Sequence, residues 1–468
     1  MANIGSISGV LASAISSIDG IAKSAISAVD GVLFSVISTL IAIIAKGTAN
    51  DAITSGIQGT SGNSSCGKTV QLDLGKYITF NGQLTNANNQ NVLGVGITQS
   101  DLTLTTSSSV LSVYPGTADL DPYGRGQAMG ACKLNSNQAL VCSPSVGVGN
   151  VFKVLTYSGG TNALVIDATF NDGDSANLVD RFPNFQLLKV SGTVYTVAST
   201  GLSRGGAFPY ARVWDIDISG SGSATSRGII YPMGTGPASG NGKTNLCYLG
   251  TVGGKECFAI FYAKSTSGAG VAYYAVYEYN TSTNTLVETV GDTLYKSGSN
   301  SFEGFVDFKI EDGRGPVMFV ENSVGYIAGA IYDGTSFSVG SSSTWGTASD
   351  LVRFPGMCPY YNGQENSTSQ FIIGNGKNSN ASGQTAKFNV FPVNYNSSSN
   401  QFDTSKYNTS DSEDVLEDSA TTTTFSGAIH NPFIGTQNTE FGSVVTTYRD
   451  SVGTFRGQRA NAFKMSKT

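Results

Sequence analysis

The run "NLCYLGTVGGKECFAIFYA" at 245–263 has the pattern of two β-strands joined by a tight turn. Apolar and aromatic residues, which favour strands, flank a central Gly-Gly pair that supplies the positive φ angles tight turns need. A similar run, "AMGACKLNSNQALVCSP", occupies 128–144. The sequence therefore predicts recurring β-hairpins.

Four further runs share this pattern, and each hairpin is followed by a second strand pair around a polar turn, as in 273–290 and 387–405. The unit thus predicted has about four strands. The four further hairpin runs are "NFQLLKVSGTVYTVAS" at 184–199, "FVDFKIEDGRGPVMFVEN" at 305–322, "MCPYYNGQENSTSQFIIGN" at 357–375 and "AIHNPFIGTQNTEFGSVVTTY" at 428–448.

Matched cysteines and a short motif set the period of the repeat. Cys132 and Cys142 lie ten residues apart across one turn, and Cys247 and Cys257 lie ten apart across the equivalent turn two units later. The motif "LVDRFP" at 178–183 returns three units later as "LVRFP". Its matching residues are Arg181, Phe182 and Pro183 in the first copy and Arg353, Phe354 and Pro355 in the second.

These separations indicate a period of about 57 residues, which is the signature of a β-propeller built from four-stranded blades. An earlier unit is expected at "VQLDLGKYITFNGQL", 70–84, which makes seven blades. Six blades remain open if 70–117 forms a lid or a docking strand instead. Because the last unit is short, we expect a strand from near the start of the domain to complete it.

Composition supports an all-β chain and excludes one class of partner. The 468 residues include 58 Gly, 24 Phe and 21 Tyr, and suffice for one large β domain or two to three smaller ones. The net charge is −6 and no Lys/Arg cluster stands out. A protein of this kind lacks the basic surface that binds nucleic acid.

The N-terminus repeats every 11 residues as "NIGSISGV", "AISSIDGI" and "AISAVDGV". We expect each unit to be a short helical turn ended by a left-handed glycine, which gains stability by stacking on neighbours or on other chains. The alternative is one helical coil with an 11-residue repeat. Either structure predicts an anchor or oligomerisation segment over 1–45, with these repeat positions: Ile4, Ile7, Gly9, Val10, Ile15, Ile18, Gly20, Ile21, Ile26, Val29, Gly31 and Val32.

Residues 46–69 are rich in Gly, Ser, Thr and Asn and are interpreted as a linker, which places the propeller at 70–468. "GNSSCGKT" at 62–69 fits the phosphate-binding P-loop pattern, but a strand-like run follows it where the P-loop needs a helix. The apolar run 32–45 is too short and too polar for a membrane span, and the start of the chain lacks the basic region of a signal peptide.

No catalytic, metal or cofactor site is assigned, and we do not expect an enzyme. The lone histidine, His430, lies in a strand-like run and is expected in the core. "DIDISG" at 215–220 begins like a calcium loop but has apolar residues between its carboxylates, so a strand is favoured. The acidic run 410–419 is expected to be a solvated loop. The cysteines lack zinc-site spacing, and buried thiols are favoured over disulfides.

The N-terminal repeats resemble the short Ala-Asn-Ile-x-x-Val-Asn-Gly-Val repeats of tailed-bacteriophage tail-fibre and other virion structural proteins, with Asp or Ser in place of the second Asn. The resemblance implies a homo-oligomeric virion protein, a fibre or appendage that docks on other virion proteins through 1–45. The propeller would then project and contact host-surface glycans. The alternatives are a free, secreted lectin-like propeller and a glycan depolymerase.

Overall fold

All regular structure in the described residues is β-strand. Of the 468 residues, the computed structural model describes 17–18, 21–22, 28–29, 32–33, 41–47, 67–73, 75–81, 91–98, 103–106, 111–112, 130–145, 147–158, 160–203, 208–232, 244–264, 270–301, 306, 308–347, 352–361, 366–377, 387–417, 430–436, 440–449 and 455–467.

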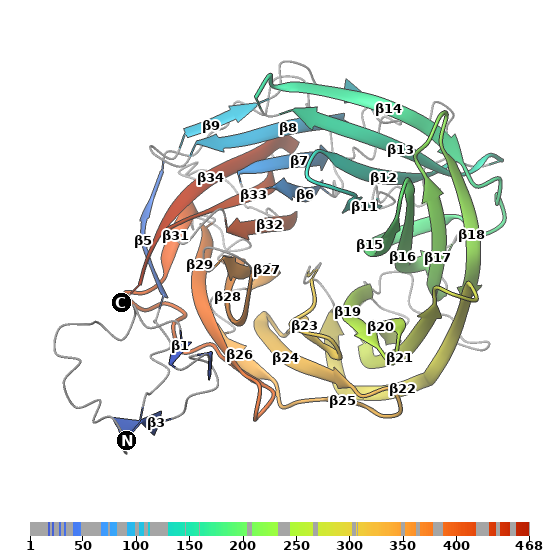
Figure 1. The fold of residues 1–468 in the computed structure, drawn as a ribbon. Helices are drawn as coiled ribbons and strands as arrows, with labels where there is room; N and C mark the ends of the chain where they lie inside the picture. Colours follow the sequence, from blue (N-terminus) through green and yellow to red (C-terminus); the bar gives the residue numbers. More distant parts are fainter. Residues whose placement is uncertain are drawn as a thin grey trace.

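The strands form seven antiparallel blades around a central axis (Figure 1). Blade 1 contains β6 (Gly67–Asp73), β7 (Lys76–Asn81), β8 (Asn91–Thr98), β9 (Thr103–Thr106) and β10 (Leu111–Ser112). Blade 2 contains β11 (Gly130–Lys133), β12 (Gln138–Ser145), β13 (Gly149–Ser158) and β14 (Ala163–Asn171). Blade 3 contains β15 (Val179–Ser191), β16 (Val194–Ser203), β17 (Pro209–Asp217) and β18 (Ser223–Ile230). Blade 4 contains β19 (Thr244–Val252), β20 (Lys255–Lys264), β21 (Gly270–Asn280) and β22 (Thr285–Ser301). Blade 5 contains β23 (Arg314–Glu321), β24 (Val324–Tyr332), β25 (Phe337–Val339) and β26 (Ser343–Trp345). Blade 6 contains β27 (Arg353–Tyr361), β28 (Asn366–Lys377), β29 (Lys387–Asn396), β30 (Gln401–Asp403) and β31 (Glu413–Glu417). Blade 7 contains β32 (His430–Thr436), β33 (Phe441–Arg449), β34 (Phe455–Lys467) and β5 (Ile41–Lys46).

The propeller prediction is confirmed, and the first predicted unit is a blade rather than a lid. The strands near the axis contact one another in the order β6, β11, β15, β19, β23, β27 and β32, and β32 contacts β6 again. The ring therefore closes with seven blades, and every hairpin run expected from the sequence lies at the inner side of one of them.

The last blade is completed by the N-terminal strand β5, as expected from the short seventh unit. β5 pairs with β34, with Ile41 opposite Lys467 and Ile43 opposite Met465. Ile41 and Ile43 are buried in the core shared with blade 6. Residues 41–45 therefore belong to the propeller and not to the N-terminal segment, because the apolar run there fills the empty fourth position of the sheet.

The predicted linker also ends earlier than expected. β6 begins at Gly67, and Lys68 and Thr69 pair with Phe80 and Thr79 of β7. The "GKT" of the P-loop pattern therefore lies in a strand, where a P-loop would begin a helix. The propeller starts three residues before the expected residue 70.

Blade 5 departs from the regular pattern. β22 runs beyond blade 4 and pairs with β23 through Asn300 and Ser301, so that the two blades share one sheet. The segment before β23, expected as a strand, makes one bridge between Glu311 and Arg314 and is otherwise irregular in its described residues. The extension of β22 takes part of the pairing edge that this segment would need.

The cores lie between neighbouring blades. Six buried clusters of the described residues each draw side chains from two adjacent blades. Between blades 2 and 3, the Trp214 ring stacks on Phe185 at 5.8 Å and meets Phe152 edge-on at 5.5 Å. Burial of such aromatic side chains is the main attraction that holds flat sheets face to face.

The two faces of the disc differ in their connections. In the blades other than blade 5, the turn face carries the first-to-second and third-to-fourth strand turns, such as 192–193 and 281–284. In blade 5 the turn 322–323 between β23 and β24 lies beside Val352 at the opposite face. The connection face carries the ends of the strands that lead from blade to blade and from second to third strand, and among these connections 172–178, between β14 and β15, is described throughout. Since β5 begins beside the end of β34, the chain enters the propeller at the turn face.

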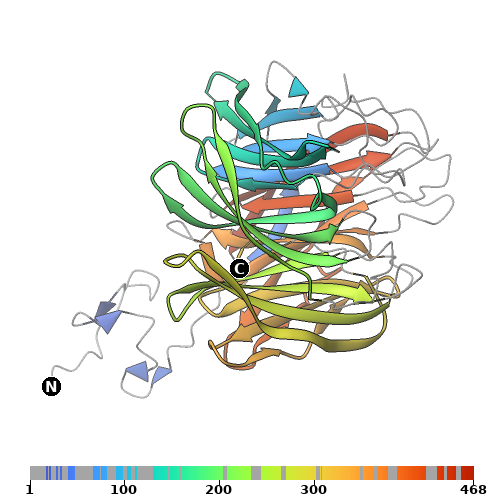
Figure 2. The same cartoon turned by 90° about the vertical axis from the view of Figure 1, so that its right-hand side faces the viewer.

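The second and third N-terminal repeat units contain hairpins, so the helical turns expected there, and the alternative of one helical coil, are wrong. β1 (Ser17–Ile18) pairs with β2 (Ile21–Ala22), and β3 (Ala28–Val29) pairs with β4 (Val32–Leu33). Each pair encloses Asp-Gly, the dipeptide favoured in two-residue hairpin turns. Figure 2 shows these strands beside the disc, beyond the turn face. The first unit, with Ile4, Ile7, Gly9 and Val10, lies outside the described residues, as do Ile15, Gly20, Ile26 and Gly31.

Candidate functional site

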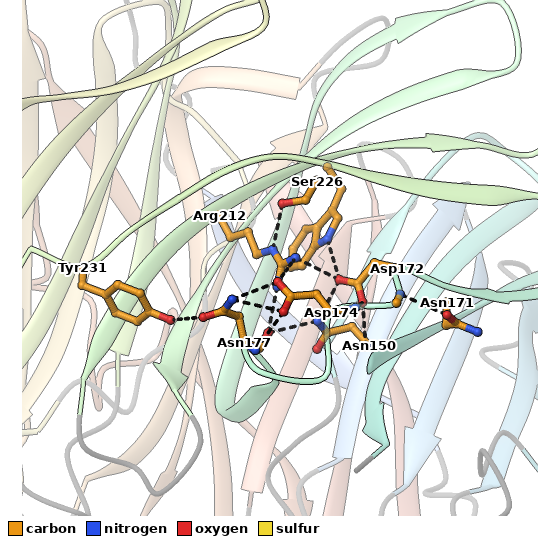
Figure 3. Close-up of polar contacts among 10 residues, drawn as sticks. Asn150, Asn171, Asp172, Asp174, Asn177, Arg212, Ser226 and Tyr231 are labelled. Atoms are coloured by element: carbon orange, nitrogen blue, oxygen red, sulfur yellow. Dashed lines mark hydrogen bonds and ion pairs between the residues drawn. The ribbon is translucent and has the colours of Figure 1, made fainter. Parts of the chain in front are cut away.

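The connection between β14 and β15, residues 172–178 at the connection face, carries a polar cluster between blades 2 and 3 (Figure 3). Its sequence, "DGDSANL", begins with two carboxylates around a glycine at φ 68°. Arg212 reaches this connection from the third residue position after the start of β17. The cluster therefore joins the connection after the outer strand of blade 2 to the third strand of blade 3.

Arg212 is the centre of the cluster and is completely buried. Its Nη2 lies 3.0 Å from Oδ2 of both Asp172 and Asp174. Nη1 donates to the Asn177 carbonyl at 2.8 Å, and Nε donates to Ser226 Oγ at 3.2 Å. The guanidinium also lies 4.6 Å from the centre of the Trp214 ring. A planar guanidinium is well suited to bind several acceptors at once in this way.

Asp172 is the fully buried partner of Arg212. Its carboxylate accepts hydrogen bonds from Trp214 Nε1 at 3.1 Å and from the backbone and side chain of Asn150, both at 2.9 Å. A buried ion pair is tolerated when further hydrogen bonds satisfy its remaining polar groups. Asp172 and Arg212 therefore form a fixed brace between the two blades.

Three side chains form the outer edge of the cluster, here called the polar rim: Asp174, Asn177 and Tyr231. Asn177 Nδ2 donates to Asp174, and Tyr231 Oη donates to Asn177 Oδ1 at 2.9 Å. Tyr231 is 37% exposed and the Asp174 side chain 29% exposed. Burial acts to raise the pKa of Asp174, but hydrogen bonds from Asn177 and the Arg212 charge outweigh it and lower the pKa.

The polar rim is equipped for binding and not for proton donation. With its lowered pKa, Asp174 stays ionised and accepts hydrogen bonds, whereas a general acid needs a raised pKa. An exposed tyrosine ring beside amide and carboxylate groups offers an apolar face and fixed acceptors together. The brace beneath holds these groups in place.

A second carboxyl cluster lies on β22, between blades 3 and 4. Glu288 accepts from Tyr277 Oη at 3.2 Å, and Asp292 accepts from Tyr262 Oη at 2.5 Å. Burial raises the pKa of Glu288 and the nearby Asp292 charge adds to the increase, while the Tyr277 hydrogen bond opposes it. Asp292 also pairs with Lys264. Glycoside hydrolysis uses a pair of carboxyl groups, one of them with a raised pKa.

The blade markers occupy equivalent positions, as the repeat predicts. Cys132 and Cys142 lie on β11 and β12, and Cys247 and Cys257 lie on β19 and β20, the first two strands of blades 2 and 4. Arg181, Phe182 and Pro183 lie near the start of β15, and Arg353, Phe354 and Pro355 begin β27, three blades on. These residues mark the repeat and do not meet in a common site.

The cysteine pairs are not directly opposite each other. Gly130 pairs with Cys142, and Ala259 pairs with Cys247, so each cysteine is offset from the other by two residues. Cys142, Cys247 and Cys257 are free buried thiols. Burial raises the pKa of each, that of Cys257 to about 12, so these thiols are unreactive at neutral pH.

The remaining motifs resolve as structural. Residues 215–217 continue β17, as favoured over a calcium loop. His430 begins β32, with its backbone opposite Thr447. The acidic run 410–419, expected to be a loop, contains β31, because Glu413 and Asp414 pair with Lys46 and Lys387 beside β29. In the part of the chain that the structure describes, no group of acidic, histidine or cysteine residues is arranged to hold a metal ion, and no helix is long and apolar enough to cross a membrane.

Sequence reasoning did not find the Arg212 cluster. A usable signal was present in "YARVWDIDI" at 210–218, where an arginine interrupts an apolar stretch of a predicted strand. A charge at a position buried on both sides demands a partner. The partners, however, lie about 40 residues earlier in a polar connection, and no local spacing rule joins the two.

Comparison with known proteins gives fold-level similarity. No protein-family model matches the chain, and no curated protein matches it in sequence. Similar solved structures include a periplasmic gluconolactonase from Pseudomonas aeruginosa, with 10% identity, a TM-score of 0.43, and coverage of 82% of this chain and 94% of that one. A fucose-specific lectin from Aleuria aurantia has 12% identity, a TM-score of 0.38, and coverage of 73% and 96%. A sialidase from Streptococcus pneumoniae has 10% identity, a TM-score of 0.41, and coverage of 86% and 69%.

Proposed function

We propose that this chain is a virion appendage protein that docks through its N-terminal hairpin repeats and displays the connection face of its propeller to host-surface glycans. One observation carries the proposal. The chain enters the propeller at the turn face, where β5 begins, so residues 1–40 leave from the face opposite the long connections and the polar rim. A protein anchored by this segment would point the connection face outward.

The hairpin repeats support the docking role. A two-residue strand pair is too small to be stable alone in water and needs an apolar neighbour. Ile18 pairs with Ile21 and Val29 pairs with Val32 in the two hairpins, so an apolar residue type stands on each side of each turn. Other virion proteins and further copies of this chain are the expected partners.

Removal of residues 1–40 is expected to abolish incorporation into particles while the propeller stays folded, because the deletion ends before β5. The measurement is the copy number of the full-length and shortened chains in purified virions by quantitative mass spectrometry. Circular dichroism of the shortened chain controls for folding. Equal incorporation of both chains would overturn the docking role, and a full-length chain absent from particles would favour a free lectin.

Substitution of Tyr231 by Ala and of Asp174 by Asn is expected to weaken glycan binding about 10-fold or more each, because the rim would lose its aromatic face or its charge. Binding of the full chain to a glycan array and to host cells is the measurement. Asp403→Asn, an exposed carboxylate at the turn face, is the matched control and should bind normally.

Equal binding by all three variants would show that the polar rim does not contact the glycan. A different result would reassign the protein as a depolymerase: release of reducing ends from the bound polysaccharide, lost in Glu288→Gln. Glu288 is the residue for this test because its raised pKa suits a general acid.

A further inference from the structure

A cavity of about 240 Å³ lies among the innermost strands of blades 1, 2 and 3. β6 contributes Gln71, the end of β11 contributes Cys132 and Lys133 with Leu134 beyond it, and β15 contributes Phe185, Gln186 and Leu187. Lys133 and Leu134 adjoin the first turn of blade 2, so the cavity is near the turn face. It is separate from the polar rim, which lies at the connection face.

The cavity wall is polar for a reason built into the propeller. β11 and β15 are each the first strand of their sheets, so one backbone edge of each has no strand neighbour within its sheet. Edge strands present N–H and C=O groups that seek hydrogen bonds. The side chains of Gln71 and Gln186 add amide groups to this lining. Their Nε2 atoms donate to the Asp73 and Leu187 carbonyls, while Gln186 Oε1 is buried without a hydrogen-bond partner among the described residues and can accept from a ligand hydroxyl. A ligand with several hydroxyl groups matches such a surface.

Lys133 gives the cavity a positive charge. Its side chain is exposed, and no carboxylate among the described residues forms an ion pair with it. The chain as a whole carries a net charge of −6, whereas the charge of Lys133 is positive. An ammonium group in a partly enclosed site favours a carboxylate as its partner.

Size and apolar contacts narrow the ligand further. Pockets for drug-sized ligands usually have volumes of roughly 300–1,000 Å³, so about 240 Å³ suits a single small ring. Leu134 and Leu187 supply apolar surface for a carbon skeleton. We propose that this cavity binds one small hydroxylated carboxylate, a free sugar acid, with its carboxylate on Lys133 and its hydroxyl groups on the strand edges and amides.

Isothermal titration of the full chain with sodium D-glucuronate, at constant ionic strength, tests the proposal. For a ligand of this size we expect a dissociation constant of about 1 mM and a matching rise in the unfolding temperature. D-glucose, the neutral counterpart, should bind at least about 10-fold more weakly, because it lacks the charge-assisted contact with Lys133. Absence of glucuronate binding, or equal binding of glucose, overturns the proposal.

Variants of two lysines locate the site. Lys133→Gln should weaken glucuronate binding about 10- to 100-fold, and Lys133→Arg should retain most of it, since the charge remains. Lys189→Gln is the matched control, because Lys189 is an exposed lysine on β15 that contacts Thr281 away from the cavity. Unchanged binding by Lys133→Gln, or an equal loss in Lys189→Gln, would place any binding elsewhere. Thermal unfolding of each variant without ligand shows that a loss of binding is not a loss of fold.

Discussion

Replacement of Ile43 by Ala should lower the free energy of unfolding by about 2–5 kcal/mol, whereas the same change at the next residue, Ile44, should alter it by less than about 0.5 kcal/mol. Ile43 is 1% exposed and Ile44 51% exposed, although both lie on β5. The difference arises because Ile43 fills the core between blades 6 and 7. Urea denaturation of the two variants beside the unmodified chain measures it.

Deletion of residues 1–47 should have a larger effect than either substitution. It removes β5 entirely, loses the burial of Ile41 and Ile43, which contributes about 3–6 kcal/mol, and exposes the edge of β34 to aggregation. Deletion of residues 1–40 keeps β5 and is the control. Equal stability of the two shortened chains would show that the ring does not depend on its N-terminal strand.

Arg212→Met should destabilise the protein by about 3–5 kcal/mol, because it leaves the buried Asp172 carboxylate without its counter-charge. Arg227→Met is the matched control on the adjacent strand. Arg227 pairs with Asp215 at 2.7 Å, but its side chain is 32% exposed, and such a pair contributes no more than about 1 kcal/mol. Chemical denaturation of both variants gives the comparison.

A double variant separates the ion pair from simple packing. Arg212→Met combined with Asp172→Asn should be less destabilised than the sum of the single changes, since neither buried charge is then left alone. Additive losses would mean that Arg212 acts only by filling space. Similar stabilities of Arg212→Met and Arg227→Met would mean that blades 2 and 3 need no such brace.

The sequence predicted the propeller because its evidence is periodic. Hairpins with Gly-Gly or polar turns, and cysteines that return at the same strand position two blades later, report a geometry that is repeated along the chain. The closing strand was inferred from a missing fourth strand, but its position was not. An apolar run such as 32–45 is expected both in a buried strand and in an assembly segment. Composition alone therefore could not show that the propeller strand begins at residue 41.

The N-terminal hairpins were missed because one glycine signal has two meanings. Asp-Gly after an isoleucine fits a helix end with a left-handed glycine and also a two-residue hairpin turn. Ile21 lies three positions after Ile18, a spacing that fits both structures. The polar rim was missed for a different reason, since Asp174 and Tyr231 meet only through the packing of separate blades.

The pairing of β5 with β34 also has a consequence for how the protein is made. Ile41 is synthesised long before Lys467, yet these residues are partners in one sheet. Contacts between residues so far apart in the chain form slowly, and the edges of the unfinished sheet stay exposed until the ring closes. Synthesis that stops before β34 leaves blade 7 unfinished, so only chains that include both β5 and β34 can close the ring. Ring closure therefore depends on synthesis that continues through β34.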